Sequence, residues 1–177
     1  MKEIQVITGC MFSGKTTELI TRLKCAKGDS LLIKPLVDNR NSGNRVFTHS
    51  GIVENAIKVR HLSDVFDQLK NINVIGIDEA QFFPGSIIQD LLHLNSKKIK
   101  IIIAGLEKDY LNQPFDVMTD IISIADKITR LYANCSCGEK ATCSYRKNTN
   151  SKQQLLIGDK NFYEALCDTC FSNRQPF

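Results

Sequence analysis

The stretch IQVITGCMFSGKTTELITRLK, residues 4–24, holds the most informative local pattern of this sequence. Its opening run, Ile4–Thr8, is short and mostly β-branched, which indicates a β-strand. Residues 17–24 lack glycine and proline and carry apolar residues at helical spacing. A glycine-bounded loop, residues 9–16, joins the two. Strand, loop and helix in this order form the context that a phosphate-binding loop requires.

The loop has the residue types that bind nucleotide phosphates: Gly9, Cys10, Met11, Phe12, Ser13, Gly14, Lys15 and Thr16. Its glycines allow a tight wrap in which backbone N–H groups converge on one point, and the helix N-terminus adds partial positive charge there. Lys15 is expected to reach the terminal phosphates of ATP, and the Thr16 hydroxyl to complete the shell of a Mg²⁺ ion. A strand-to-helix turn often uses glycine, but that reading does not explain Gly-Lys-Thr at this offset.

Further along the chain, three apolar runs predict β-strands at residues 30–34, 73–78 and 99–104. Residues 87–94 have the spacing of an amphipathic helix. Continuous apolar strands separated by helices indicate an α/β fold, a parallel sheet covered by helices on both faces. Right-handed crossovers place the loops at the carboxyl ends of the strands along one edge. Residues 38–51 are polar and turn-rich, and we expect a long mobile loop there.

The composition is that of an ordinary globular protein, with 177 residues, 42% hydrophobic and 24% charged. The first strand begins at the N-terminus and no apolar run approaches bilayer length, so we expect a cytoplasmic protein without a signal peptide. Residues 1–130 and 131–177 each carry a net charge of +2. Because neither part has a strong basic excess, we do not expect nucleic acid as a partner. Because no apolar run is long enough to span a bilayer, we do not expect a membrane as a partner either.

A second motif, Asp78-Glu79-Ala80-Gln81-Phe82-Phe83, follows the apolar strand at residues 73–78. Asp78 is placed to hold Mg²⁺ opposite Thr16. Phosphoryl transfer to an alcohol also needs a group that orients or deprotonates the nucleophile, and Glu79 is the candidate. The alternative is that Asp78 and Glu79 are a solvated acidic pair that caps the next helix. The phosphate loop upstream favours the roles in metal binding and catalysis over this alternative.

Together these motifs resemble the thymidine kinases of the cellular and poxviral type, over essentially the whole chain. That family transfers the γ-phosphate of ATP to the 5′-hydroxyl of thymidine. The resemblance implies a RecA-like P-loop domain over residues 1–131 and a zinc-binding domain with a lasso loop over the substrate at residues 132–177. It also implies a homotetramer and feedback inhibition by dTTP. The matching segments are Gly9–Thr16, Asp38–Arg40, Thr48-His49, Ile75–Pro84, Ala104–Leu106, Pro114-Phe115 and the cysteine pairs that flank Ile157-Gly158 and Tyr163.

The resemblance also assigns roles to single residues. Glu79 is implied as the general base, and the loop Gly9–Thr16 is joined at the ATP and Mg²⁺ site by Asp38, Arg40, Asp78 and Gln81. Residues implied in thymidine binding are Phe82, Leu106, Tyr110, Phe115, Gln154, Leu155, Leu156, Ile157, Gly158 and Tyr163. Without the family match, core packing would be the preferred role for Phe82, Leu106 and Phe115, and packing against the zinc unit is an alternative for Tyr163.

Five of the seven cysteines crowd the last part of the chain, which favours metal binding over disulfides in an intracellular protein. Cys167 and Cys170 have zinc-knuckle spacing, whereas their partners Cys135 and Cys137 stand one residue closer than is common. Cys143 is therefore a rival ligand. Our choice is Cys135, Cys137, Cys167 and Cys170, a closed structural zinc site. The remaining two cysteines, Cys10 and Cys25, are expected to be buried.

Two other classes of protein remain as alternatives. The sequence Asp-Glu-Ala-Gln also resembles the second motif of helicases, although those need two motor domains and this chain has room for one. A nucleotide-gated zinc module that binds nucleic acid is the non-enzymatic alternative, and the lack of a basic patch in residues 131–177 counts against it.

Overall fold

The computed structural model describes residues 3–38, 45–47, 53–147 and 162–174. A six-stranded sheet in the order β5-β2-β6-β7-β1-β8 forms its centre, and every neighbouring pair in it is parallel. The predicted α/β fold with a parallel sheet is confirmed. The strands are β1 (Ile4–Gly9), β2 (Asp29–Pro35), β5 (Ile57–Val59), β6 (Ile72–Ile77), β7 (Lys100–Gly105) and β8 (Lys127–Leu131).

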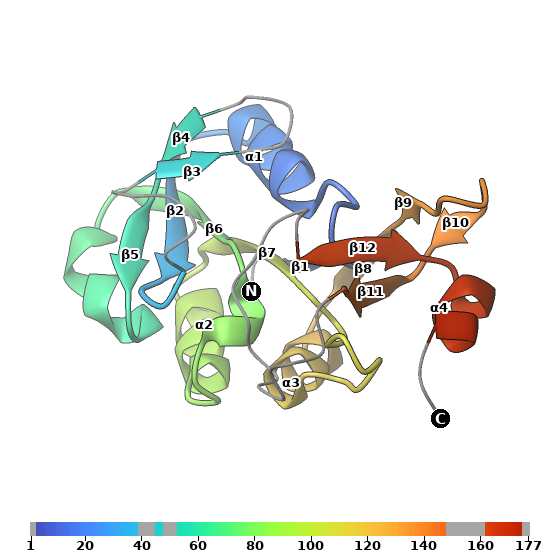
Figure 1. The fold of residues 1–177 in the computed structure, drawn as a ribbon. Coiled ribbons are helices and arrows are strands. Elements are labelled where there is room, and N and C mark those ends of the chain that lie inside the picture. The colour runs from blue at the N-terminus through green and yellow to red at the C-terminus, as the bar shows by residue number, and fades with distance from the viewer. Residues whose placement is uncertain (1–2, 39–44, 48–52, 148–161, 175–177) are drawn as a thin grey trace.

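Helices cover both faces of this sheet (Figure 1). The helix α1 (Lys15–Cys25) packs on one face through Leu19, Ile20 and Leu23. On the opposite face lie α2 (Ile87–Ser96), α3 (Asp116–Ser123) and the 3₁₀ helix η1 (Leu62–Gln68). The sequence predicted α1 and α2, but we had no prediction for α3, η1, β5 or β8.

Strand side chains alternate between the two cores, as the period of a β-strand requires. In β7, Ile101 and Ile103 face the core under α2 and α3, whereas Ile102 and Ala104 face α1. Gly76 of β6 lies directly beneath α1, and a Cβ atom built there would stand 2.5 Å from Leu23 Cδ1. A glycine at this position therefore allows helix α1 to pack closely on the sheet.

The predicted mobile loop at residues 38–51 is wrong where the structure describes it. Strand β3 (Arg45–Phe47) pairs antiparallel with β4 (Val53–Asn55). Val46 is buried in the core on the α1 side, together with Ala56. The burial of Val46 helps to fix this hairpin to the sheet, which the overall polarity of the segment concealed. Residues 39–44 and 48–52 lie outside the described part of the chain.

After the sheet comes a small unit, which we call the cysteine unit (residues 133–147 and 162–174). Strand β8 ends at Leu131 and β9 begins two residues later; the division into two domains at this point stays a prediction. Two antiparallel pairs, β9 with β10 and β11 with β12, are followed by a short helix, α4. The elements are β9 (Ala133–Asn134), β10 (Lys140–Ala141), β11 (Cys143–Arg146), β12 (Tyr163–Leu166) and α4 (Asp168–Arg174).

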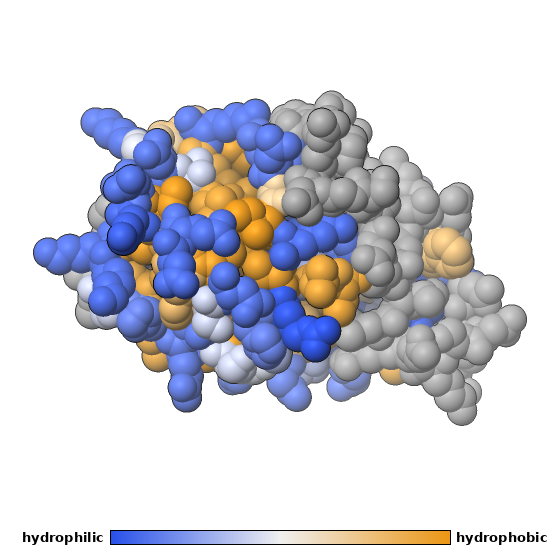
Figure 2. All heavy atoms as spheres, turned by 90° about the vertical axis from the view of Figure 1, so that its left-hand side faces the viewer, coloured by the Kyte–Doolittle hydropathy of each residue, from blue (hydrophilic) through white to orange (hydrophobic). Residues whose placement is uncertain are grey.

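Strand β5 forms one edge of the sheet, and Figure 2 views the molecule from this end. Apolar atoms form a patch there among polar ones. Leu36 and Val37, which follow β2 beside β5, are 46% and 52% exposed.

Of the two isolated cysteines that were expected to be buried, Cys10 is buried, but Cys25 is exposed at the end of α1. None of the helices in the described residues is long and apolar enough to cross a membrane.

Candidate active site

The phosphate loop lies between β1 and α1, as its sequence predicts. Gly14 has a φ of 86°, a left-handed conformation that favours glycine, and a Cβ atom built there would meet nothing within 4 Å. Lys15 Nζ donates to the carbonyl oxygen of Cys10 at 2.7 Å, so its side chain runs back along the loop. Ser13 Oγ is buried and has no hydrogen-bond partner among the described residues. Open space, a lysine and an orphaned hydroxyl fit the phosphates of a nucleotide.

Thr16 and Asp78 meet at the edge of the sheet. The Thr16 hydroxyl lies 3.2 and 3.1 Å from the two carboxylate oxygens of Asp78. Asp78 follows β6, and its amide donates to the carbonyl oxygen of Ile33 in the neighbouring strand at 2.9 Å. Asp78 is 5% exposed. A hydroxyl and a buried carboxylate beside a phosphate loop are the oxygen ligands that suit Mg²⁺.

Glu79 stands next to this pair in a left-handed backbone conformation, with φ 53°. It precedes the 3₁₀ helix η2 (Ala80–Phe82), and its side chain is half-buried. Its carboxylate accepts a hydrogen bond from Gln81 Nε2. Gln81 is itself anchored, because its Oε1 accepts from the amide of Leu106 at 2.9 Å. The amide of Gln81 therefore ties the acidic motif to the end of β7 and orients the Glu79 carboxylate.

The apolar residues expected around a base differ in their surroundings. Phe82 is half-buried after the acidic motif, and Leu106, also half-buried, packs against the main core. Phe115 is only 7% exposed and is a member of that core. Packing in the core therefore accounts for Phe115, the role that its residue type alone favours. Contact of these three side chains with a base stays a prediction.

Tyr110 and Tyr163, from different parts of the chain, meet at one arginine. Arg146 of β11 is 1% exposed, and its guanidinium carbon lies 3.5 Å from the centre of the Tyr110 ring. Its Nη2 and Nε donate to the Tyr163 hydroxyl at 3.0 and 3.3 Å. Arg146 and Tyr163 are also direct partners in the β11–β12 ladder. The two predicted substrate tyrosines are thus held by a single buried cation.

Seven further residues were predicted to bind ATP or thymidine: Asp38, Arg40 and the five residues 154–158. Asp38 is 5% exposed, and its amide donates to the carbonyl oxygen of Pro35 in the turn after β2. Arg40 and the segment 154–158 (Gln154, Leu155, Leu156, Ile157 and Gly158) lie outside the described residues. Their predicted roles stay predictions.

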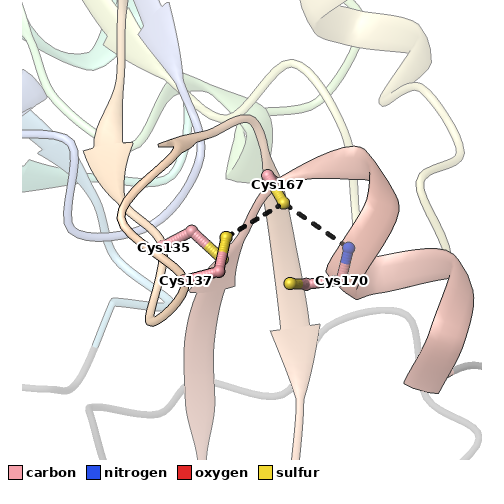
Figure 3. A group of neighbouring side chains, drawn as sticks. All are labelled: Cys135, Cys137, Cys167 and Cys170. Atoms are coloured by element: carbon pink, nitrogen blue, oxygen red, sulfur yellow. Dashed lines mark hydrogen bonds between the residues drawn. The ribbon is translucent and has the colours of Figure 1, made fainter.

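Four cysteines converge in the cysteine unit (Figure 3): Cys135, Cys137, Cys167 and Cys170. Their sulfur atoms all lie within 4.8 Å of one another, and the Cys137 and Cys167 sulfurs are 3.6 Å apart. In a tetrahedral zinc site with Zn–S bonds of about 2.3 Å, sulfur atoms stand roughly 3.8 Å apart. Hydrogen bonds from the backbone of Cys137 and Cys167 lower the pKa of the Cys135 thiol to about 6, whereas hydrogen bonds with neighbouring thiols, that with Cys137 first, raise the pKa of the Cys170 thiol to about 12. The spacing of the four sulfur atoms and their soft donor chemistry fit zinc.

Cys143, the rival ligand, lies outside this group. Its sulfur is 3.2 Å from a carboxylate oxygen of Asp168, to which it donates, and burial raises the pKa of its thiol to about 11. Cys143 is therefore a protonated thiol engaged with α4. The geometry brings together the four cysteines that the sequence analysis chose, despite the tight spacing of Cys135 and Cys137.

Two residues beside the site had no role in the sequence analysis, namely Arg146 and Ser144. Ser144 Oγ accepts a hydrogen bond from the amide of Met11 in the phosphate loop at 3.0 Å. Both residues are almost fully buried, at 1% and 5% exposure. A buried arginine and a serine that reaches a loop more than 130 positions earlier carry no local signal, because both contacts arise from tertiary structure.

The chain is similar to known proteins over nearly its whole length. The family model "Thymidine kinase" matches residues 2–171. A thymidine kinase of Coprothermobacter proteolyticus is 40% identical over 174 residues, covering 93% of this chain and 88% of the relative. One of Mesomycoplasma hyopneumoniae is 40% identical over 175 residues, covering 96% and 95%. One of Porphyromonas gingivalis is 36% identical over 172 residues, covering 95% and 84%. This chain belongs to the thymidine kinase family of nucleoside kinases.

Proposed function

We propose that this protein transfers the γ-phosphate of ATP to the 5′-hydroxyl of thymidine, which gives dTMP and ADP. The observation that carries the proposal is the meeting of three groups at one edge of the sheet. The phosphate loop ends in Thr16, Thr16 contacts Asp78, and Glu79 is the next residue along the chain. Donor, metal and acceptor chemistry are thereby adjacent, in a chain of the thymidine kinase family.

On the donor side, the loop Gly9–Thr16 holds the phosphates, and Lys15 offsets their negative charge. Thr16 and Asp78 hold Mg²⁺, which neutralises charge on the phosphates during transfer. Asp38, Arg40 and Gln81 are proposed at the same site, Gln81 through its contact with Glu79. Lys15 must exchange the Cys10 carbonyl for phosphate oxygens when the nucleotide binds.

On the acceptor side, Glu79 takes the proton from the 5′-hydroxyl as the oxygen attacks the γ-phosphorus. The half-buried carboxylate is anchored through Gln81, so it can point at one place without being removed from water altogether. Such positioning supplies much of the rate in phosphoryl transfer.

The nucleoside is proposed to lie against apolar and aromatic side chains, which suit a flat pyrimidine. Tyr110 and Tyr163 are held by Arg146 and form the fixed part of this site. Phe82, Leu106 and Phe115 and the lasso residues 154–158 complete the proposal. Closing a lasso over the base would keep water away from the γ-phosphate.

The cysteine unit is proposed to hold one structural Zn²⁺ through Cys135, Cys137, Cys167 and Cys170. Four thiolates leave no open position on the ion, so the metal supplies stability and takes no part in the reaction. On the basis of family resemblance we further propose a homotetramer and feedback inhibition by dTTP. A cytoplasmic location is proposed separately, as expected from the sequence. Light scattering during gel filtration tests the assembly, and inhibition of turnover by dTTP tests the feedback.

The experiment that tests the function measures ADP release from ATP and Mg²⁺ with each common nucleoside, for the wild type and for Lys15→Ala. We expect release that depends on thymidine and is lost in Lys15→Ala, because the lysine offsets phosphate charge. Hydrolysis that is indifferent to every nucleoside would overturn the proposal and favour a motor or regulatory ATPase.

A further inference from the structure

The first half of the phosphate loop is packed into the cysteine unit. Cys10 belongs to the same hydrophobic cluster as Cys135, Leu166 and Phe171, and Phe12 packs against that cluster. The Cys10 thiol also donates to the carbonyl oxygen of Ala141 at 3.2 Å. The loop therefore shares its core with residues more than 120 positions later in the chain.

One hydrogen bond connects the backbone of the loop to this unit. The amide of Met11 donates to Ser144 Oγ at 3.0 Å, and Ser144 is 5% exposed. Ser144 lies on β11, which pairs with β12 from Cys143 to Arg146. Its hydroxyl is thus presented to the loop by a paired strand.

The loop needs such support, because Phe12, next to Met11, has a φ of 65°. A left-handed conformation is unfavourable for a bulky residue that is not glycine, and it persists only where surrounding contacts impose it. Among the described residues, the cysteine unit contacts both Phe12 and the residue before it. Ser144 holds the preceding amide, and the core of the cysteine unit holds the phenylalanine ring.

We propose that Ser144 is a positioning residue of the phosphate loop: its hydroxyl, held by the cysteine unit, keeps the loop in the conformation that binds the phosphates of ATP. This inference rests on the proposed function in one respect, the binding of nucleotide by this loop. Ser144 acts through Met11, so its effect is expected on nucleotide affinity.

The size of the effect follows from the hydrogen bond. Without the hydroxyl, the Met11 amide loses the partner that Ser144 provides, and the left-handed turn at Phe12 loses a support. The loop then spends less time in the competent conformation, and the apparent affinity for nucleotide falls by that fraction. For the loss of one hydrogen bond we expect about a three- to tenfold weaker affinity.

The test is calorimetric titration of ADP with Mg²⁺, without nucleoside, into the wild type, Ser144→Ala and Thr142→Ala. Thr142 is the matched control, because it lies beside the same hairpin and its hydroxyl donates to Asp168 at 2.9 Å, away from the loop. We expect weaker ADP binding for Ser144→Ala and wild-type binding for Thr142→Ala. Hydrogen exchange at the Met11 amide should accelerate in Ser144→Ala alone, with metal content unchanged.

A second pair of variants keeps the test decisive if Ser144→Ala fails to fold. Ser144→Thr and Ser144→Val have nearly the same shape and differ in the hydroxyl. Affinity for ADP should be higher in Ser144→Thr than in Ser144→Val. Equal affinities in this pair, or wild-type affinity and exchange in Ser144→Ala, would overturn the role of Ser144 while leaving thymidine-dependent turnover of the wild type intact. A wild type that binds no ADP would overturn this inference and the proposed function together.

Discussion

The sheet and the cysteine unit differ in what stabilises them. Among the described residues, the main core cluster of the sheet contains twenty buried side chains, nearly all of them aliphatic or aromatic. The cluster of the cysteine unit contains eight, and four of those are cysteines, one contributed by the phosphate loop. A core of the first kind is stable through apolar burial, whereas one of the second kind is small, and the proposed zinc would supply stability that it lacks. The proposed active site therefore draws on two regions whose buried cores differ in size and composition.

Removing a ligand cysteine is expected to have the largest effect. Wild type is expected to bind one Zn²⁺ per chain, and Cys135→Ser should lose it because one of the four ligands is missing. The variant should also be destabilised, because apparent binding energies of structural zinc are on the order of 10 kcal/mol and contribute to folding. Cys143→Ser is the matched control, since both thiols are buried but the Cys143 sulfur contacts Asp168. Metal analysis of the purified variants checks this. Metal loss in Cys143→Ser with retention in Cys135→Ser would reverse the ligand assignment.

The Glu79→Gln variant is expected to affect the reaction and spare both parts of the fold. Loss of the proposed general base should lower kcat by roughly two or more orders of magnitude, while ATP affinity is retained. Zinc content and the urea unfolding midpoint should match the wild type. Steady-state kinetics and ADP titration make the measurement, and unchanged turnover would remove Glu79 from the mechanism.

A core substitution tests the other side of the comparison. Leu91 of α2 is fully buried, whereas its neighbour Leu92 is 49% exposed. Leu91→Ala should lower the free energy of unfolding by about 2–5 kcal/mol, and Leu92→Ala by well under about 1 kcal/mol. Both variants should keep their zinc. Comparable losses in the two variants would show that the sheet does not depend on this core as described.

The smallest effect concerns pH. Burial raises the pKa of the Cys143 thiol from 9.0 to about 11, so the folded protein holds this proton more tightly than the unfolded chain. The stability that this proton contributes is fully present below pH 9 and is lost as the pH rises toward 11. When the pH is raised from 8 to 10.5, the unfolding midpoint should therefore fall further for the wild type than for Cys143→Ser. Equal falls would show that Cys143 does not titrate as its burial implies.

Much of the sheet part could be predicted from the sequence because its signals are local. The loop Gly9–Thr16 and the acidic Asp78 each directly follow an apolar strand, and parallel strands bring such positions to one edge. The contact between Thr16 and Asp78 is the outcome. By contrast, β5, β8 and α3 were not predicted because their patterns are short or weak. Strand β3 was missed because its segment is polar overall, although Val46 in it is buried.

The two residues that hold the predicted tyrosines and the phosphate loop, Arg146 and Ser144, could not be predicted from the sequence, because their contacts arise from tertiary structure. Arg146 is a charged residue that is ordinarily exposed, and its burial depends on Tyr110 and Tyr163 from two other segments. Ser144 becomes relevant only once the cysteine unit packs on the loop. The four cysteines of the candidate metal site were predicted from the sequence with Cys143 as a rival. The tertiary structure places Cys143 outside that group.

The most direct test of the central claim follows the γ-phosphate itself. The wild type is incubated with ATP, Mg²⁺ and thymidine, and the phosphorylated products are identified by ³¹P NMR and mass spectrometry, with 5′-deoxythymidine as the control that lacks the acceptor hydroxyl. We expect dTMP with the phosphate on the 5′-oxygen, formed in step with ADP, and no transfer to 5′-deoxythymidine. Inorganic phosphate as the product with either nucleoside would contradict this expectation.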